Sequence, residues 1–154
     1  MQKLNFPLSS HRMRREGDIP RIFDPIRKKW LLLTPEEWVR QHLIHYLRDE
    51  KKCPVALMAI ETSLQMNGMT RRSDVVIFDR AKTPLLLAEC KAPLVKLSQS
   101  AFDQAARYNM TLKVPYLLVT NGLEHFCCHI DFENQSYSFL TDIPDFDEML
   151  LRKA

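Results

Sequence analysis

The sequence predicts an α/β fold with a central mixed sheet flanked by helices, an N-terminal hairpin and further strands near the C-terminus. Two observations predict this fold class. The apolar runs at 75–78 and 85–88 have the length and composition of buried strands. The segments at 34–50 and 98–110 each begin at a capping residue and carry apolar side chains at helical spacing. Helices and strands therefore alternate along the chain, as they do in α/β folds.

Length and composition indicate one domain. The 154 residues are 45% apolar, which is enough for one core and not comfortably for two. We expect a basic tail at 1–20 and a single domain over 21–154. No apolar run approaches the ~20 residues that span a bilayer, and no secretory signal is evident. The four cysteines show no CxxC spacing, so we expect a cytoplasmic protein without zinc or membrane contact.

The charge is distributed unevenly. Residues 1–113 carry 20 Lys/Arg and 12 Asp/Glu, whereas 114–151 carry seven acids and no Lys or Arg. A basic side and an acidic end fit a protein that meets a polyanion with part of its surface. Ordinary solvated charge explains the counts equally well.

The first elements follow from local signals. Residues 21–33 predict a hairpin that turns near Asp24-Pro25. A helix then begins at Thr34, with Pro35 in its first turn and Glu37 completing a capping box. The helix is expected to end near Glu50.

Two turns predict a row of carboxylates. With Asn67-Gly68 as a two-residue turn after a strand at 56–64, Glu61 lies opposite Asp74. With a four-residue loop at 80–83, Asp79 pairs with Pro84 and Asp74 lies opposite Glu89. The three acids then share one face of three adjacent strands.

Opposed carboxylates repel each other and are costly to bury unless a positive charge lies between them. Mg²⁺ suits such hard oxygen ligands. Lys91 shares the face of Glu89, because side chains two apart in a strand point the same way. The alternative is an ion-pair network without metal, in which Glu61 forms a diagonal salt bridge with Arg72.

The second half continues the pattern. Ser98 or Ser100 caps a helix on which Gln104 and Tyr108 share a face. The apolar run at 114–120 predicts a central strand buried on both sides. A strand at 123–132, a hairpin at 133–136 and a short acidic closing helix complete the fold. His125 and His129 lie on the expected strand, too far apart there for a metal pair.

The arrangement Asp74-x14-Glu89-x-Lys91 resembles the PD-(D/E)xK nucleases, with the restriction-endonuclease-like core that this implies. Four sequence segments resemble the N-terminal nuclease domain of type I restriction enzyme R subunits, and more closely the small standalone relatives of that domain. These segments are RKKWLLLTPEEWVRQ, LLLAECKAP, FDQAARYN and VTNG. The resemblance spans about 21–144. One departure is Ser73, where the family has Pro before the Asp.

The resemblance implies a Mg²⁺- or Mn²⁺-dependent DNA endonuclease of a restriction-modification system. Asp74, Glu89 and Lys91 would be catalytic, with Gln104 and Tyr108 positioning the strand. The metal ligands would be Asp74, Glu89, the backbone carbonyl of Cys90 and, as an open candidate, Glu61. Glu37 is a further candidate, although its capping role is the better interpretation. Implied DNA contacts are Arg71, Arg72 and Arg107.

The implied partners are DNA and the motor or specificity subunits of a restriction system, with homo-oligomerisation open. No P-loop motif is present, so we expect no ATP-driven translocation by this chain. Two alternatives stay open. One is a catalytically inert DNA-binding or assembly module of the same fold, and the other is a structural domain whose acids and Lys91 form an ion-pair network.

Overall fold

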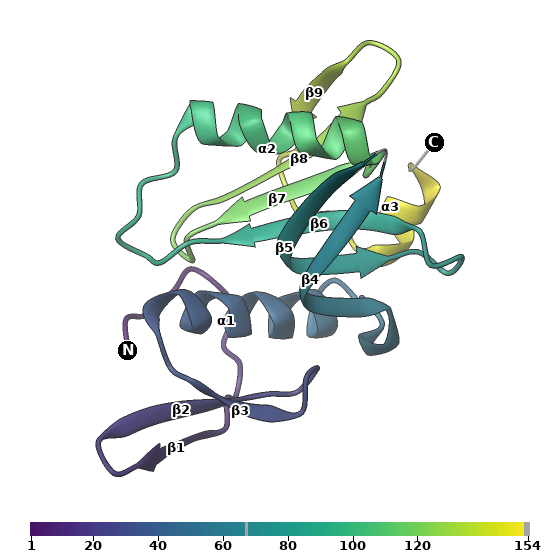
Figure 1. Cartoon of the computed structure of the whole chain (residues 1–154). Helices are drawn as coiled ribbons and strands as arrows, with labels where there is room; N and C mark the ends of the chain where they lie inside the picture. Colours follow the sequence, from purple (N-terminus) through teal and green to yellow (C-terminus); the bar gives the residue numbers. More distant parts are fainter. Residues whose placement is uncertain (67, 153–154) are drawn as a thin grey trace.

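The computed structural model describes residues 1–66 and 68–152. Its centre is a six-stranded sheet in the order β4-β5-β6-β7-β8-β9, in which only β6 and β7 run parallel. The strands are β4 (Met58–Met66), β5 (Met69–Phe78), β6 (Pro84–Cys90), β7 (Tyr116–Thr120), β8 (His125–Asp131) and β9 (Ser136–Phe139). Helix α1 (Pro35–Asp49) covers one face of the sheet and α2 (Gln99–Leu112) covers the other (Figure 1). The predicted mixed sheet flanked by helices is confirmed.

The sheet is a buried layer because its central strands are apolar on both faces. All five residues of β7 are buried, and β7 lies between β6 and β8, as its unbroken apolar run predicts. In β6 the faces alternate: Leu86 packs in the core that contains Leu43 of α1, and Leu87 packs with Leu112 of α2. The two helices therefore fix both faces of the strand that ends at Glu89 and Cys90.

The predicted basic tail at 1–20 is wrong. Residues Met13–Glu16 form β1, which pairs with β2 (Ile19–Asp24), and β3 (Lys29–Leu32) completes a separate three-stranded sheet. Leu4 is buried, and the Asn5 amide donates to the carbonyl of Gly122 at 2.7 Å. The sequence did not predict this strand because β1 is exposed along its whole length and shows no apolar alternation among the charged residues at 12–18. The hairpin near Asp24-Pro25 is confirmed.

The predicted registers of the β4–β5 and β5–β6 pairs are confirmed, but the predicted four-residue loop between β5 and β6 is wrong. In β4–β5 the pair Met66↔Met69 closes the hairpin around the expected turn, of which Asn67 lies outside the described residues. In β5–β6 the ladder has the expected register at Val75↔Ala88. The loop itself differs, because Phe78 pairs with Pro84 and the ladder is irregular there. Asp79 lies in the loop, where its carboxylate accepts hydrogen bonds from two loop amides.

The remaining elements follow the sequence closely. Thr34 caps α1 and Ser98 caps α2 through their side chains. Residues Val55–Leu57 form a 3₁₀ turn (η1) ahead of β4, and α3 (Phe146–Leu151) closes the chain. None of the helices in the described part of the chain is long and apolar enough to cross a bilayer.

Candidate functional site

Asp74 lies where the β5–β6 ladder ends. The last regular pair is Val75↔Ala88, and the next position on β5 belongs to Asp74. Its Oδ2 accepts a hydrogen bond from the Cys90 amide at 2.7 Å. The Asp74 carboxylate therefore stands beside the segment that carries Glu89 and Cys90, at the point where β5 leaves β6.

Arg40 of α1 neutralises Asp74. Its Nη2 lies 2.8 Å from Asp74 Oδ1 and 3.6 Å from Glu61 Oε1, and its Nη1 forms an ion pair with Glu37. The Arg40 side chain is only 5% exposed. Burial alone would lower the pKa of Arg40, but the hydrogen bond to Asp74 and the charge of Glu37 raise it. The guanidinium supplies the positive charge between the buried Glu37 and the partly buried Asp74 and Glu61.

Arg27, in the β2–β3 turn, is a second cation of this cluster and is largely shielded from solvent. Its guanidinium contacts Asp24 Oδ2 at 2.6 Å, Glu37 Oε1 at 3.1 Å and Glu61 Oε2 at 2.7 Å. Burial raises the pKa of Asp24, but hydrogen bonds from Arg27 and Gln41 outweigh it and hold that pKa below its usual range. The two arginines thus bind the N-terminal sheet, α1 and β4 into one ion-pair network.

Sequence reasoning missed Arg27, Arg40, Asp24 and Gln41. One signal was available, because Arg40 follows Glu36 and Glu37 at helical spacings that bring such side chains together. The contacts of Arg27 with Glu61 and of Arg40 with Asp74 each join residues 34 positions apart, and no local pattern predicts them.

Glu61 occupies the predicted position without completing the predicted row. The pairs Ile60↔Val75 and Thr62↔Ser73 flank it, so the register that sets Glu61 opposite Asp74 is confirmed. Its backbone is in the left-handed region, with φ of 49°, and interrupts the ladder. Its carboxylate faces Arg27 and Arg40, and the alternative diagonal salt bridge to Arg72 is present at 3.7 Å.

A groove of about 390 Å³ lies on the α2 side of the sheet, and we call it the Glu89 groove. It brings together side chains from β5, from α2 and from the end of β6. Its lining residues are Thr70, Arg71, Arg72, Glu89, Lys91, Ala101, Gln104, Ala105 and Tyr108. Six residues that the sequence singled out therefore share one surface.

Arg71 organises the Glu89 groove. It forms an ion pair with Glu89, and its guanidinium lies 4.6 Å from the centre of the Tyr108 ring. Lys91 is exposed, and no described carboxylate lies within ion-pair distance of its ammonium group. Its backbone amide donates to Thr120 O at 2.8 Å, which anchors it to the end of β7. The groove thus presents an unpaired lysine beside a paired acid.

The groove lining does not include the predicted site residues Glu37, Glu61, Asp74, Cys90 or Arg107. Asp74 forms an ion pair with Arg40 of α1 and accepts a hydrogen bond from the Cys90 amide beside the groove. Arg107 is exposed on α2 and lines neighbouring hollows with Met110 and Thr111. The structure therefore brings Arg71 and Arg72 together with Glu89, and leaves Arg107 beside them on the same helix as Tyr108.

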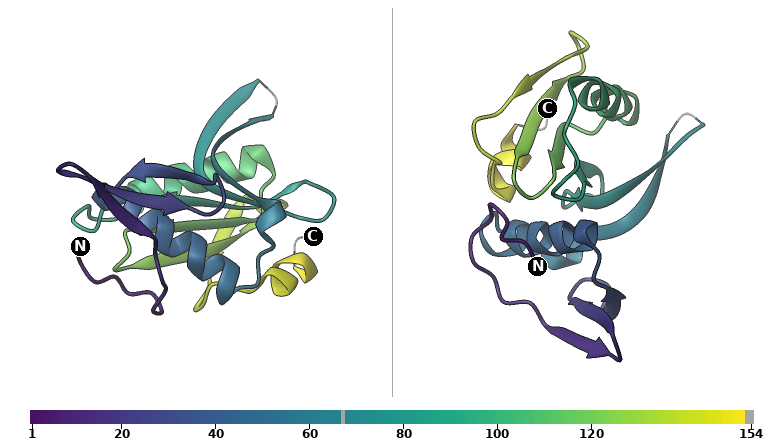
Figure 2. Two further views of the ribbon diagram at one scale, coloured as in Figure 1. Left: turned by 90° about the horizontal axis from the view of Figure 1, so that it is seen from below. Right: turned by 90° about the vertical axis from the view of Figure 1, so that its left-hand side faces the viewer.

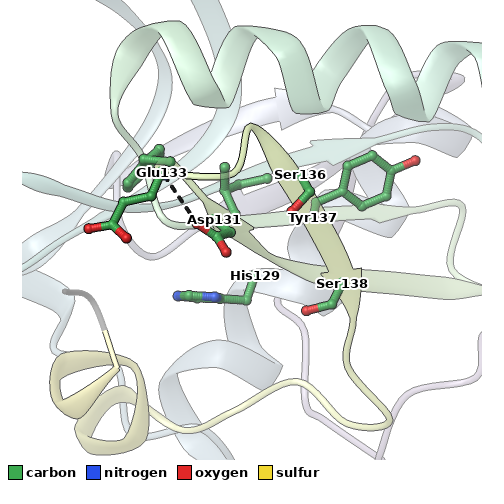
Figure 3. Close-up of a pocket in the computed structure, with 8 residues that line it drawn as sticks. His129, Asp131, Glu133, Ser136, Tyr137 and Ser138 are labelled. Carbon is green, nitrogen blue, oxygen red and sulfur yellow. Dashed lines mark hydrogen bonds between the residues drawn. The ribbon is translucent and has the colours of Figure 1, made fainter.

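A larger hollow, of about 470 Å³, lies on β8 and β9 (Figure 3). Its labelled residues include His129, Asp131 and Glu133, and its lining contains no Lys or Arg. Asp131 accepts a hydrogen bond from the Glu133 amide at 3.1 Å. His125 and His129 lie on one strand, where the His125 ring hydrogen-bonds with the Asn5 carbonyl and the His129 ring with the Arg152 carbonyl. An acidic hollow is unsuited to a polyanion.

Asp74 and Glu89 offer oxygen ligands of the kind that Mg²⁺ prefers. Each carboxylate is neutralised by one arginine, Arg40 or Arg71, so each already holds a positive charge. Within residues 1–66 and 68–152, no three His, Cys, Asp or Glu side chains are grouped to hold a metal. Two carboxylates suffice for Mg²⁺, which keeps several waters. The donor chemistry fits, and Glu61 would join only if Arg27 and Arg40 released it.

Comparisons with known proteins bear on the family and the fold of the chain. Residues 35–144 match the family model described as type I restriction enzyme R protein N terminus. A solved fragment assigned as an HsdR subunit of a type I restriction enzyme from Vibrio vulnificus YJ016 is similar, with a TM-score of 0.56 and 19% identity. The similarity covers 78% of this chain and 25% of that one, so the chain spans a quarter of its length. No curated protein sequence matches. The chain belongs to the family of the type I restriction enzyme R protein N terminus.

Proposed function

We propose that this protein is a metal-dependent DNA phosphodiesterase, an endonuclease of the PD-(D/E)xK type. The observation that carries the proposal is the Glu89 groove, which gathers Glu89, Lys91, Gln104 and Tyr108 from separate elements next to Asp74. Cations line the same groove, as a site for a phosphodiester requires.

Asp74, Glu89 and the backbone carbonyl of Cys90 would hold Mg²⁺ or Mn²⁺. When bound, the metal would stabilise charge on the attacked phosphate and lower the pKa of a bound water. Lys91 is exposed and without an acidic partner among the described residues, so its ammonium group is free to contact the phosphate oxygens. Lys91 thereby stabilises the negative charge that grows in the transition state.

The other residues of the groove would position the DNA strand. Gln104 is exposed on α2, one helical turn from Tyr108, and both line the groove. Arg72 has a side chain 68% exposed and can reach a phosphate, whereas Arg71 is engaged with Glu89. Arg107 extends the positive surface along α2. These residues would fix a DNA strand across Glu89 and Lys91.

The test is cleavage of supercoiled plasmid by purified protein with Mg²⁺ or Mn²⁺, compared with Asp74→Asn and Glu89→Gln. Both substitutions keep side-chain volume and remove a charged ligand, so cleavage should fall by ~10²-fold or more. Lys96→Gln, which removes an exposed charge outside the groove, serves as the matched control. Cleavage that survives both carboxylate substitutions would overturn the proposal.

A second candidate function is a catalytically inert DNA-binding or assembly module. The specific observation in its favour is that Arg40 and Arg71 already neutralise Asp74 and Glu89, so the acids need no metal for stability. Calorimetry separates the two candidates, because the nuclease binds one Mg²⁺ or Mn²⁺ in a manner that Asp74→Asn weakens, and the inert module binds none.

The partners follow from the family. We propose that the chain acts on DNA together with motor or specificity subunits of a restriction system. Size-exclusion chromatography with light scattering would report homo-oligomers, and co-purification with a tagged chain would report the subunits.

A further inference from the structure

The N-terminal sheet presents an outward face built from arginines and aromatic rings. Ile22 and Asp24 of β2 are fully buried, and Gln41 of α1 donates to Asp24 at 3.0 Å, so this side of the sheet faces α1. Strand alternation turns the intervening Arg21 and Phe23 the other way. The outward residues are Arg12, Arg14, Arg21, Phe23 and Trp30, which we call the Arg-aromatic face.

The rings hold the guanidinium groups in place. Phe23 and Trp30 are cross-strand partners with ring centres 5.4 Å apart. The Arg12 guanidinium lies 4.3 Å from the Phe23 ring centre and 5.5 Å from that of Trp30, and the Arg14 guanidinium lies 4.2 Å from Trp30. A stacked guanidinium keeps its N–H donors at its edge and loses less side-chain freedom when it binds an anion.

This segment is also the most basic part of the chain. Residues 12–32 carry seven Lys/Arg and three Asp/Glu, whereas all other residues together carry 15 Lys/Arg and 16 Asp/Glu. One of the three acids, Asp24, is buried against Arg27. The whole net positive charge of the protein therefore comes from this small sheet and its turns, which is the distribution expected of a surface that meets a polyanion.

The cations of this face are incompletely neutralised. Arg14 and Arg21 share Glu16, with Arg21 Nε 3.2 Å from its Oε2. No described carboxylate lies within ion-pair distance of Arg12. Since guanidinium groups already cover the rings, unpaired bases have little ring surface on which to stack, and phosphate oxygens are the better ligands.

We propose that the Arg-aromatic face binds the phosphate backbone of a DNA duplex, as a second contact besides the Glu89 groove. The choice of DNA rests on the proposed function. In both views of Figure 2 the β1–β3 sheet and the β4–β5 hairpin, which carries Arg71 and Arg72, lie toward the same side of the body. One duplex passing along that side would meet both basic surfaces, without any contact to bases.

The experiment measures binding of a fluorescein-labelled duplex by anisotropy over a range of salt concentrations, without divalent metal so that nothing is cleaved. The variant is Arg12→Gln with Arg14→Gln, both exposed. The matched control is Arg80→Gln with Lys82→Gln, which removes two exposed charges from the β5–β6 loop. The variant should bind at least ~10-fold more weakly, with a salt slope smaller by about two, and the control should match wild type.

A second readout locates the contact. In a Trp38→Phe background, Trp30 is the one remaining tryptophan, and its emission should change on addition of duplex. Equal losses in variant and control, an unchanged Trp30 signal, or tighter binding of an RNA duplex would each overturn this proposal. Its failure is distinct from that of the proposed function, because cleavage depends on Asp74 and Glu89 whereas this binding is measured without metal.

Discussion

Nη2 of Arg40 lies 2.8 Å from Oδ1 of Asp74, so a helix-borne guanidinium holds the acid that we propose as a metal ligand. The same arginine pairs with Glu37 and approaches Glu61. With Glu36, four acids from α1, β4 and β5 thus share one cation. The proposed metal and the Arg40 ion pair would compete for the same carboxylate.

This competition predicts the behaviour of Arg40→Met. The substitution keeps an unbranched side chain and removes the charge, so Mg²⁺ should bind more tightly while the metal-free protein loses about 3–5 kcal/mol of unfolding free energy. Added Mg²⁺ should restore part of that loss, because a ligand of the folded state stabilises it. Calorimetric titration and thermal unfolding with and without Mg²⁺ test this. Arg48→Met, at an exposed Asp49 pair, should change neither metal affinity nor the Mg²⁺ response.

Lys91→Ala should separate catalysis from stability. Lys91 is exposed and has no carboxylate partner among the described residues, so its loss should change unfolding free energy by less than ~0.5 kcal/mol. Cleavage should stop while metal binds as well or better, because a competing positive charge is gone. Asp74→Ala should instead weaken metal binding as it stops cleavage. A Lys91→Ala protein that cuts normally would contradict the assignment.

Tyr108 should show two separable contributions. Its ring lies 4.6 Å from the Arg71 guanidinium, which in turn pairs with Glu89. Tyr108→Phe keeps the ring, so stability should stay unchanged while any contact of the hydroxyl with DNA is lost. Tyr108→Leu should cost a further ~0.5–1 kcal/mol through the lost cation–π contact. Unfolding in urea and the KM for cleavage distinguish the two variants, and equal stability of both would contradict the Arg71 contact.

The N-terminal segment should loosen at acid pH. The His11 ring stacks on His42 and His45 of α1, each at 4.3 Å, and also contacts Trp38. Burial lowers the pKa of His11 to about 4, helped by the charges of His42, His45 and Arg48. A folded pKa below the unfolded value gives stability that is complete above about pH 6.5 and lost as pH falls through about 4.

The measurement is limited proteolysis of residues 1–11 at pH values across that range. Cleavage should increase as the pH is lowered, and His11→Phe, which keeps a ring in the stack without a titrating group, should reduce the increase. His42 and His45 also have pKa values lowered by burial and would leave a residual response. An unchanged pH dependence in His11→Phe would exclude His11 as its source.

The sequence by itself determined the elements that depend on local chemistry. Thr34 caps α1 as predicted, and Ser98, one of the two predicted candidates, caps α2. The β4–β5 register that puts Glu61 opposite Asp74 is the one that the Asn67-Gly68 signal predicts. Periodicity also put Gln104 and Tyr108 into the Glu89 groove. Capping, turn chemistry and side-chain periodicity act over a few residues, so a single sequence reveals them.

Only the tertiary structure decided which charges meet. Arg27 contacts Glu61 and Arg40 contacts Asp74, each across 34 positions of sequence. Arg71 forms an ion pair with Glu89, which lies 18 positions further along the chain. The sequence shows that buried acids need a cation, but arginines and a metal satisfy that need alike. The strand at Met13–Glu16 was not predicted because it has no apolar alternation, and only its pairing with β2 in the folded chain defines it. Ion pairs follow from distance in the folded chain, and that distance exists only once the helix, the strands and the N-terminal sheet have packed together.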